Sequence, residues 1–149
     1  MSVSNIEAEL VVISQKLRSS TVEISDRYTG GSGVIWSSKG LVVTNSHVVG
    51  RSKSPVNTSI GQSWKTRSPL SVKLENGRVI EGSVIASDPH ADLAAIQLKI
   101  EKSEVLPTPI IGNSQLLRPG EIVLAMGNPY GFSGTLTMGV IHASLRQKF

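Results

Sequence analysis

Residues 41–49 read Leu-Val-Val-Thr-Asn-Ser-His-Val-Val, an apolar run followed by a short polar segment with a histidine. Leu41–Thr44 is a short run rich in β-branched side chains, which favour extended backbone. Small polar residues follow the run, so the pattern predicts a strand that stops just before His47. Such neighbours leave the imidazole ring accessible. We therefore expect a strand-rich fold that presents His47 at the end of a strand.

Similar runs lie on both sides of this stretch and are separated by Gly, Ser, Asn and Pro. They predict strands at residues 21–25, 33–36 and 93–98. Between Leu74 and Ile80, the pair Asn76-Gly77 separates two apolar runs and suits the positive φ angles of a type I′ hairpin turn. Aromatic residues make up only 4% of the chain, so the core must consist of Val, Ile, Leu and Ala. This composition favours an all-β fold.

The N-terminal region has a helical pattern instead. Ser4-Asn5-Ile6-Glu7 fits a capping box, and apolar residues then recur at helical spacing. The pattern predicts one amphipathic helix over residues 5–18. No apolar run approaches the roughly 20 residues that span a bilayer, and the first residues lack the basic and apolar regions of a signal peptide. We expect neither a signal peptide nor a transmembrane segment in this chain, and no membrane partner; its localisation stays open.

The charge and the composition exclude several classes of function. The chain carries a formal net charge of +4 and has a pI near 9.6, yet its Lys and Arg residues are scattered. No aromatic stacking pattern interleaves with them, so we expect no binding of nucleic acid. The chain has no cysteine. Disulfides, thiolate metal sites and cysteine nucleophiles are therefore excluded.

The C-terminal region begins a second unit. Residues 101–109 contain charges and two prolines, which is typical of a linker. Residues 121–126 and 135–143 predict two strands, joined by a turn-rich Gly-Asn-Pro-Tyr-Gly segment. Two or three strands cannot close a barrel, and they would leave unpaired edges and an apolar face in water. We expect this second unit to be incomplete.

His47 and Asp92 are the candidate catalytic residues. Serine hydrolysis needs a histidine that takes and returns a proton, and a carboxylate that fixes the imidazole tautomer. Asp92 leads directly into the apolar run 93–98, where a charge is costly unless it is paired, and an imidazolium would supply that pairing. The alternative is a turn aspartate that caps the strand, as we expect for Asp88. His90 is expected to be an exposed turn residue and His142 a packing residue in a strand.

Five segments, in the same order along the chain, resemble the trypsin-like serine proteases of the HtrA/Deg family. They are Gly31–Trp36, Leu41–Val49, Asp88–Ile96, Leu117–Glu121 and Gly127–Gly131. The resemblance covers nearly the whole chain. It implies an all-β, trypsin-like double antiparallel β-barrel with an N-terminal helix and an incomplete second barrel. The corresponding division is an N-terminal helix at 1–20, a first barrel at 21–100, a linker at 101–109 and a partial second barrel at 110–149.

The resemblance also implies the roles of the candidate residues. It gives His47 the general-base role and Asp92 the orienting role, while the nucleophile belongs to a later Gly-Asn-Ser-Gly-Gly loop. The 149 residues contain no such loop, and we expect the nucleophile to lie past Phe149. Ser133 stands in a superficially similar Gly-Phe-Ser-Gly, but the next residues begin a predicted strand. We expect Ser133 to be a turn residue.

The function implied by the resemblance is serine-type endopeptidase activity on unfolded or damaged polypeptides. It requires no metal or organic cofactor, and it leaves the oligomeric state open. The alternative is a catalytically inactive product, a truncated protease or pseudoprotease that acts as an interaction module and pairs an exposed strand edge with another chain.

Overall fold

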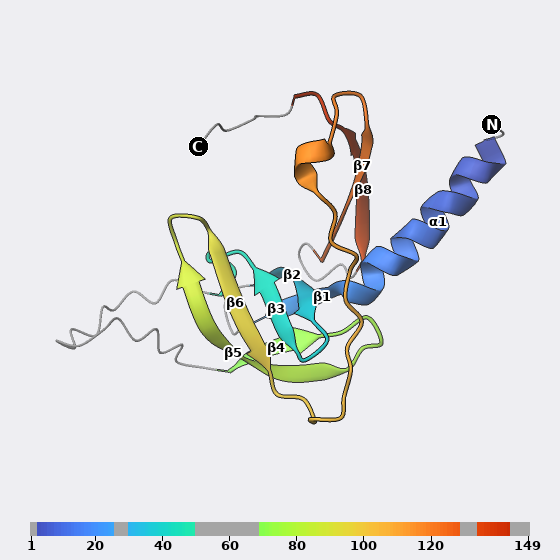
Figure 1. Ribbon diagram of the computed structural model, residues 1–149. Coiled ribbons are helices and arrows are strands. Elements are labelled where there is room, and N and C mark those ends of the chain that lie inside the picture. Colours follow the sequence, from blue (N-terminus) through green and yellow to red (C-terminus); the bar gives the residue numbers. More distant parts are fainter. Residues whose placement is uncertain (1–2, 26–29, 50–68, 129–133, 144–149) are drawn as a thin grey trace.

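The computed structural model describes residues 3–25, 30–49, 69–128 and 134–143. The chain begins with helix α1, Val3–Ser20, which projects away from the strands (Figure 1). The helix is longer than the predicted 5–18. It already includes Ser4, so the prediction that the helix is capped at Ser4 is wrong. Within the described residues, no helix has the length and apolar character needed to cross a membrane.

A closed antiparallel barrel of six strands follows the helix. The strands are β1 Thr21–Ser25, β2 Gly30–Ser37, β3 Leu41–Thr44, β4 Leu70–Lys73, β5 Val79–Asp88 and β6 Leu93–Leu98. Their order around the barrel is β1-β2-β3-β6-β5-β4, and pairing of β1 with β4 closes the ring (Figure 1). The predictions for β1, β3 and β6 match the observed bounds. The expected all-β class with an N-terminal helix is confirmed.

The barrel interior forms the hydrophobic core. Strands β1 and β3 alternate between buried and partly buried residues, as expected for strands with one face inward. The largest fully buried side chains are Ile24, Ile35, Ile96, Val22, Val42 and Val72. Among the described residues, the buried core cluster consists of Val, Ile, Leu and Ala side chains. Leu106, from the segment expected to be a linker, is also buried there, and its N–H donates to the Ser38 carbonyl.

The hairpin between β4 and β5 has a different turn from the one predicted. Asn76 does not have a positive φ angle, whereas Gly77 has a φ of +83°. The N–H of Gly77 donates to the Leu74 carbonyl, and the N–H of Leu74 donates to Arg78. A type I′ turn needs positive φ at both central residues, so that prediction is wrong. The arrangement is a three-residue connection in which Gly77 takes the left-handed position.

A small second sheet follows the barrel. The chain passes through a short 3₁₀ helix, Ser114–Leu116, to β7, Ile122–Gly127, and β8, Thr135–Val140. These two strands pair only with each other in the described part of the chain. Strand β8 ends before His142, which is exposed, so the expectation of a packing histidine within a strand is wrong. This small sheet lies in the region where the sequence predicted a second unit.

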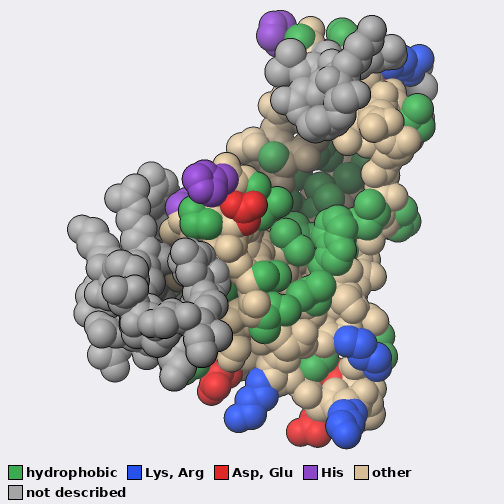
Figure 2. All heavy atoms as spheres, turned by 60° about the vertical axis from the view of Figure 1, so that its left-hand side comes forward, with side chains coloured by type: hydrophobic (Ala, Val, Ile, Leu, Met, Phe, Trp, Pro, Cys, Tyr) green, Lys and Arg blue, Asp and Glu red, His purple; other side chains and the backbone are tan. Residues whose placement is uncertain are grey.

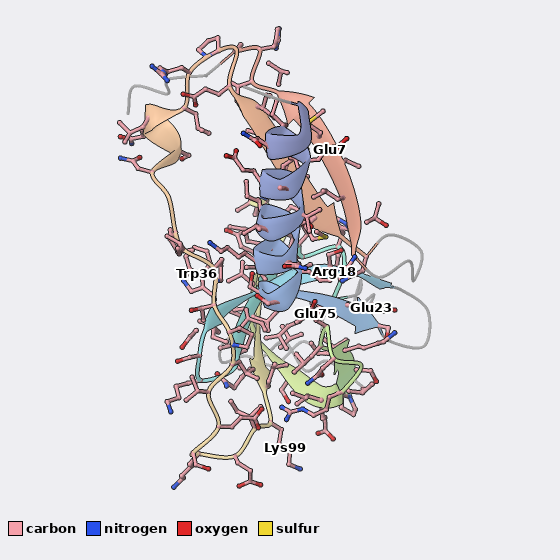
Figure 3. The ribbon with its side chains drawn as sticks, turned by 90° about the vertical axis from the view of Figure 1, so that its right-hand side faces the viewer. Glu7, Arg18, Glu23, Trp36, Glu75 and Lys99 are labelled. Atoms are coloured by element: carbon pink, nitrogen blue, oxygen red, sulfur yellow. The ribbon has the colours of Figure 1, made fainter. Side chains whose placement is uncertain are left out.

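Polar contacts join the second sheet to the barrel and the helix. The N–H of Asn128 donates to Ser32 Oγ at 2.7 Å, and Arg18 Nη2 donates to the Gly134 carbonyl at 3.4 Å. Figure 3 shows Arg18 at the barrel end of α1, near Glu23 and Glu75. A pocket of about 180 Å³ lies at this junction and is lined by residues of α1, β1, β4 and the turn after β4, together with Asn128 and Gly134, which flank the second sheet. The junction therefore contains mainly polar and charged groups.

Candidate active site

The candidate site lies at one end of the barrel, where two turns meet. Strand β3 pairs antiparallel with β6, and Thr44 lies opposite Ala94. The residues that follow β3 therefore lie beside those that precede β6. This register brings His47 and Asp92 together although they are far apart in sequence.

Three contacts join His47 to Asp92. The distance from His47 Nδ1 to Asp92 Oδ2 is 2.8 Å, and the distance from Nδ1 to Oδ1 is 3.0 Å. The backbone N–H of His47 also donates to Oδ1 at 3.1 Å. One carboxylate therefore fixes both the backbone and the ring of the histidine. A carboxylate accepts hydrogen bonds, so it favours the tautomer that carries the proton on Nδ1.

The pair lies on the surface in the described part of the chain. The side chains are 70% exposed for His47 and 47% exposed for Asp92. Figure 2 shows histidine side chains beside an acidic side chain on one face, next to hydrophobic side chains that line a hollow below the upper part of the molecule. The pKa of Asp92 is lowered, first by the hydrogen bond from the His47 backbone and then by the one from its side chain. The carboxylate is therefore ionised at neutral pH.

The turn before Asp92 is organised by Asp88. Asp88 Oδ1 accepts the N–H groups of His90 at 2.9 Å and Ala91 at 3.2 Å. This agrees with the expectation that Asp88 is a turn aspartate. His90 is exposed in this turn, again as expected. Asp88 therefore shapes the turn, while Asp92 extends from it toward His47.

The structure adds groups that the sequence did not single out. Asn45 Nδ2 donates to both the carbonyl and the carboxylate of Asp92, at 3.0 and 3.2 Å. Ser46 Oγ and Ser87 Oγ lie 3.0 Å apart and link the turn after β3 to the end of β5. In the sequence, the polar residues Asn45 and Ser46 before His47 indicated a polar turn. They did not indicate its partners, which are more than 40 residues away in sequence. Only the barrel register identifies those partners.

The arrangement leaves one ring nitrogen of His47 available for proton transfer. When Nδ1–H donates to Asp92, Nε2 carries the lone pair, and no described residue donates a hydrogen bond to it. Such a nitrogen can accept a proton from a hydroxyl, and the adjacent carboxylate stabilises the resulting imidazolium. Ser133 lies outside the described residues. In the described segments, no group of three or more metal-ligating side chains gathers.

Comparison with known proteins gives the same family resemblance. Residues 31–148 match the trypsin-like peptidase domain. The chain is 39% identical over 118 residues to the serine protease HTRA3 of Rattus norvegicus. These 118 residues cover 79% of this chain and 23% of that protein. It is 39% identical over 122 residues to the chloroplastic protease Do-like 8 of Arabidopsis thaliana, covering 80% and 26%.

A bacterial relative shows a similar level of identity. The probable periplasmic serine endoprotease DegP-like of Buchnera aphidicola is 41% identical over 114 residues, which covers 76% of this chain and 21% of that protein. The chain therefore spans about a quarter of the length of these curated relatives.

Proposed function

The chain belongs to the trypsin-like peptidase family, and we propose that it forms part of a serine endopeptidase of the HtrA/Deg kind. In this proposal, His47 is the general base and Asp92 is the acid that orients it. The substrates are polypeptides, and the resemblance favours unfolded or damaged ones. Because the chain spans about a quarter of the length of its relatives, these assignments concern the whole protein of which such a barrel is a part.

One observation carries the proposal. His47 Nδ1 lies 2.8 Å from Asp92 Oδ2, and the carboxylate also accepts the histidine backbone N–H. A carboxylate on Nδ1 selects the tautomer that a general base requires and stabilises the imidazolium formed during proton transfer. A simple surface ion pair needs no contact to the histidine backbone. The additional contact therefore supports an orienting role.

The nucleophile in this proposal is the serine of a Gly-Asn-Ser-Gly-Gly loop, which the 149 residues do not contain. Among the described residues, no serine hydroxyl bonds to the ring of His47. The same loop in such proteases supplies N–H donors for the oxyanion, each worth about 10²–10³ in rate. We therefore expect the 149-residue chain alone to have no peptidase activity.

The test compares the chain alone with a fusion to the segment that supplies this loop in HtrA/Deg proteases. We expect casein hydrolysis by the fusion, none by the chain alone, and a loss of about 10⁶-fold in kcat for His47→Ala in the fusion. His90→Ala is the matched control, because His90 is an exposed turn residue near the same site. It should retain turnover. If the folded fusion keeps the same kcat on casein when His47 is replaced by Ala, His47 is not the general base.

A result with the chain alone would contradict the assignment of the nucleophile. If the purified 149 residues hydrolyse casein and His47→Ala abolishes that activity, the nucleophile lies within the chain. Ser133→Ala then becomes the decisive variant. The fusion and the chain alone therefore test the base and the nucleophile separately.

A second candidate function is an interaction module without catalysis. The β7–β8 sheet favours it, because Ile122, Met138 and Val140 are 65%, 66% and 60% exposed. The register places these side chains on one face, with Ile122 opposite Val140 and Leu124 opposite Met138. An exposed apolar face of this kind is suited to binding another chain. A folded fusion without turnover would favour this second function.

A further inference from the structure

Asp92 has an unusual backbone conformation. Its φ angle is +51°, and it is the one non-glycine residue among those described with a positive φ. The left-handed region is unfavourable for most L-residues, although Asp and Asn enter it more readily because their side chains can bond locally. The Asp92 carboxylate instead bonds to His47 and Asn45 in another turn. Its conformation is therefore supported from outside its own turn.

Asn45 provides that support. Its Nδ2 donates to the Asp92 carbonyl at 3.0 Å and to Asp92 Oδ2 at 3.2 Å. The two hydrogens of a side-chain amide allow one nitrogen to hold both acceptors. The contact to the carbonyl holds the backbone turn, and the contact to Oδ2 holds the carboxylate. A single side chain thus fixes two parts of Asp92.

The location of Asn45 suits this role. Its turn is closed by the Val48 N–H, which donates to the Asn45 carbonyl at 3.1 Å, and the side chain of Val48 is buried in the barrel core. The backbone of Asn45 is therefore anchored to the barrel. Because the Asn45 backbone is held in place, its side-chain amide holds Asp92 at a fixed position, and Asp92 contacts His47.

Stability alone does not account for the arrangement. Asn45 and His47 are both exposed, and exposed polar pairs contribute little to folding. A left-handed backbone conformation at such a site costs free energy, and exposed polar contacts offset little of that cost. Backbone strain of this kind is concentrated at functional sites. The pKa of Asp92 is lowered chiefly by His47, and the Asn45 hydrogen bond acts in the same direction.

We infer that Asn45 is a positioning residue for the base–acid pair, which holds the Asp92 turn and carboxylate in the orientation that keeps the proton of neutral His47 on Nδ1. The catalytic meaning of this inference rests on the proposed function. The orientation itself is a property of the 149-residue chain and can be measured without any activity.

The experiment measures the ring ¹⁵N chemical shifts of His47 in the 149-residue chain at about pH 9, where an ordinary imidazole is neutral. Wild type is expected to be mainly the Nδ1–H tautomer. In Asn45→Ala, the ratio of Nε2–H to Nδ1–H should rise about fivefold, as expected when a displaced Asp92 loses the equivalent of one typical hydrogen bond to Nδ1–H. Asn45→Leu keeps the branched shape of the side chain but removes the donor and adds no charge. It should shift the ratio at least as far.

Ser46→Ala is the matched control. It removes one side-chain hydrogen bond from the same turn, the contact with Ser87, without touching Asp92. Its tautomer ratio should match wild type. Amide spectra of the buried barrel residues should be unchanged in all three variants, because Asn45 is exposed and Ser46 lies outside the core.

Two outcomes would overturn the inference. One is a wild-type tautomer ratio in both Asn45 variants, and the other is an equal change in Ser46→Ala, which would indicate general loosening of the turn. The proposed function fails in a different way. If Asn45→Ala shifts the tautomer but His47→Ala leaves turnover of the fusion unchanged, Asn45 positions the pair and the pair is not the catalytic one.

Discussion

The six-stranded barrel and the β7–β8 sheet consist of the same kind of strand, yet among the described residues the barrel encloses its apolar side chains and the sheet does not. Both are antiparallel and rich in Val, Ile and Leu. Each barrel strand has two neighbours, and Ile24 and Ile96 are 0% exposed. Strands β7 and β8 have one neighbour each in the described residues, and Met138 is 66% exposed. Closure, rather than composition, separates the two regions.

This difference explains where the candidate site lies. A closed barrel has a fixed register, so it can hold the turns after β3 and before β6 at a defined distance. In the described segments, no residue of β7 or β8 belongs to the buried hydrophobic cluster. The sheet is attached through contacts such as those of Asn128 and Arg18. The barrel can therefore orient His47 and Asp92 without a contribution from the second sheet.

The largest effect on stability is expected from truncating the barrel core. Ile96→Ala should reduce the free energy of unfolding by about 2–5 kcal/mol, because it leaves a cavity in a packed interior. Met138→Ala should change it by less than about 0.5 kcal/mol, because Met138 is mostly exposed. Urea unfolding measures both. Similar losses for the two variants would show that the sheet is as well packed as the barrel.

Two glycines sharpen the comparison because their substitutions should have opposite signs. A Cβ on Gly33 would lie 2.7 Å from Ile24 Cδ1 and 2.8 Å from Val42 Cγ1. Gly33→Ala should therefore destabilise the barrel by about 1–3 kcal/mol. A Cβ on Gly139 in β8 has its nearest contact at 3.9 Å. Gly139→Ala should stabilise by about 0.4–1 kcal/mol, because it reduces the entropy of the unfolded chain.

The midpoints of thermal unfolding show whether each glycine variant is more or less stable than wild type. A fall for Gly139→Ala comparable to that for Gly33→Ala would indicate a neighbour packed against β8. Equal, small changes in both would indicate that the barrel core can relax around an added methyl group.

The smallest effect is expected at acid pH. The pKa of Asp92 is lowered by the hydrogen bonds from His47, and that of Glu121 by the hydrogen bonds from Arg118. A lowered pKa in the folded state adds stability above the ordinary pKa, and this is lost as the pH falls through the folded-state value. Asp92→Asn and Glu121→Gln should each flatten the loss of stability below about pH 4.

The two carboxylates should differ in degree. Arg118 is only three residues from Glu121, so part of that interaction can persist in the unfolded chain. The contact between His47 and Asp92 depends on the barrel register and disappears on unfolding. Asp92→Asn should therefore reduce the loss of stability between neutral pH and about pH 3 more than Glu121→Gln does. The urea midpoints of each variant at the two pH values measure that loss. The reverse order would show that the Asp92 contact is not maintained in solution.

The sequence predicted the strands of the barrel where local pattern determines them. Runs 21–25, 41–44 and 93–98 match β1, β3 and β6, because short β-branched segments between turn residues leave little choice. Turn geometry was less predictable. Asn76-Gly77 fits two turn types that differ by one residue in loop length, and the pairing of β4 with β5 decides between them.

The parts of the site that could not be predicted depend on contacts that are distant in sequence. The local setting and the family resemblance indicated His47 and Asp92. The role of Asn45 in holding the left-handed Asp92 requires the register between β3 and β6. Leu106 was also missed, because a lone apolar residue in a loop has no periodic pattern that would indicate burial.

In the proposed function, the barrel orients His47 through Asp92 for general-base catalysis. The direct measurement is kcat of the fusion enzyme with Asp92→Asn, which keeps the shape of the side chain but allows the amide to hold the wrong imidazole tautomer. We expect the barrel to stay folded and kcat to fall by about 10⁴-fold. Near-normal kcat in the folded Asp92→Asn variant would contradict the claim.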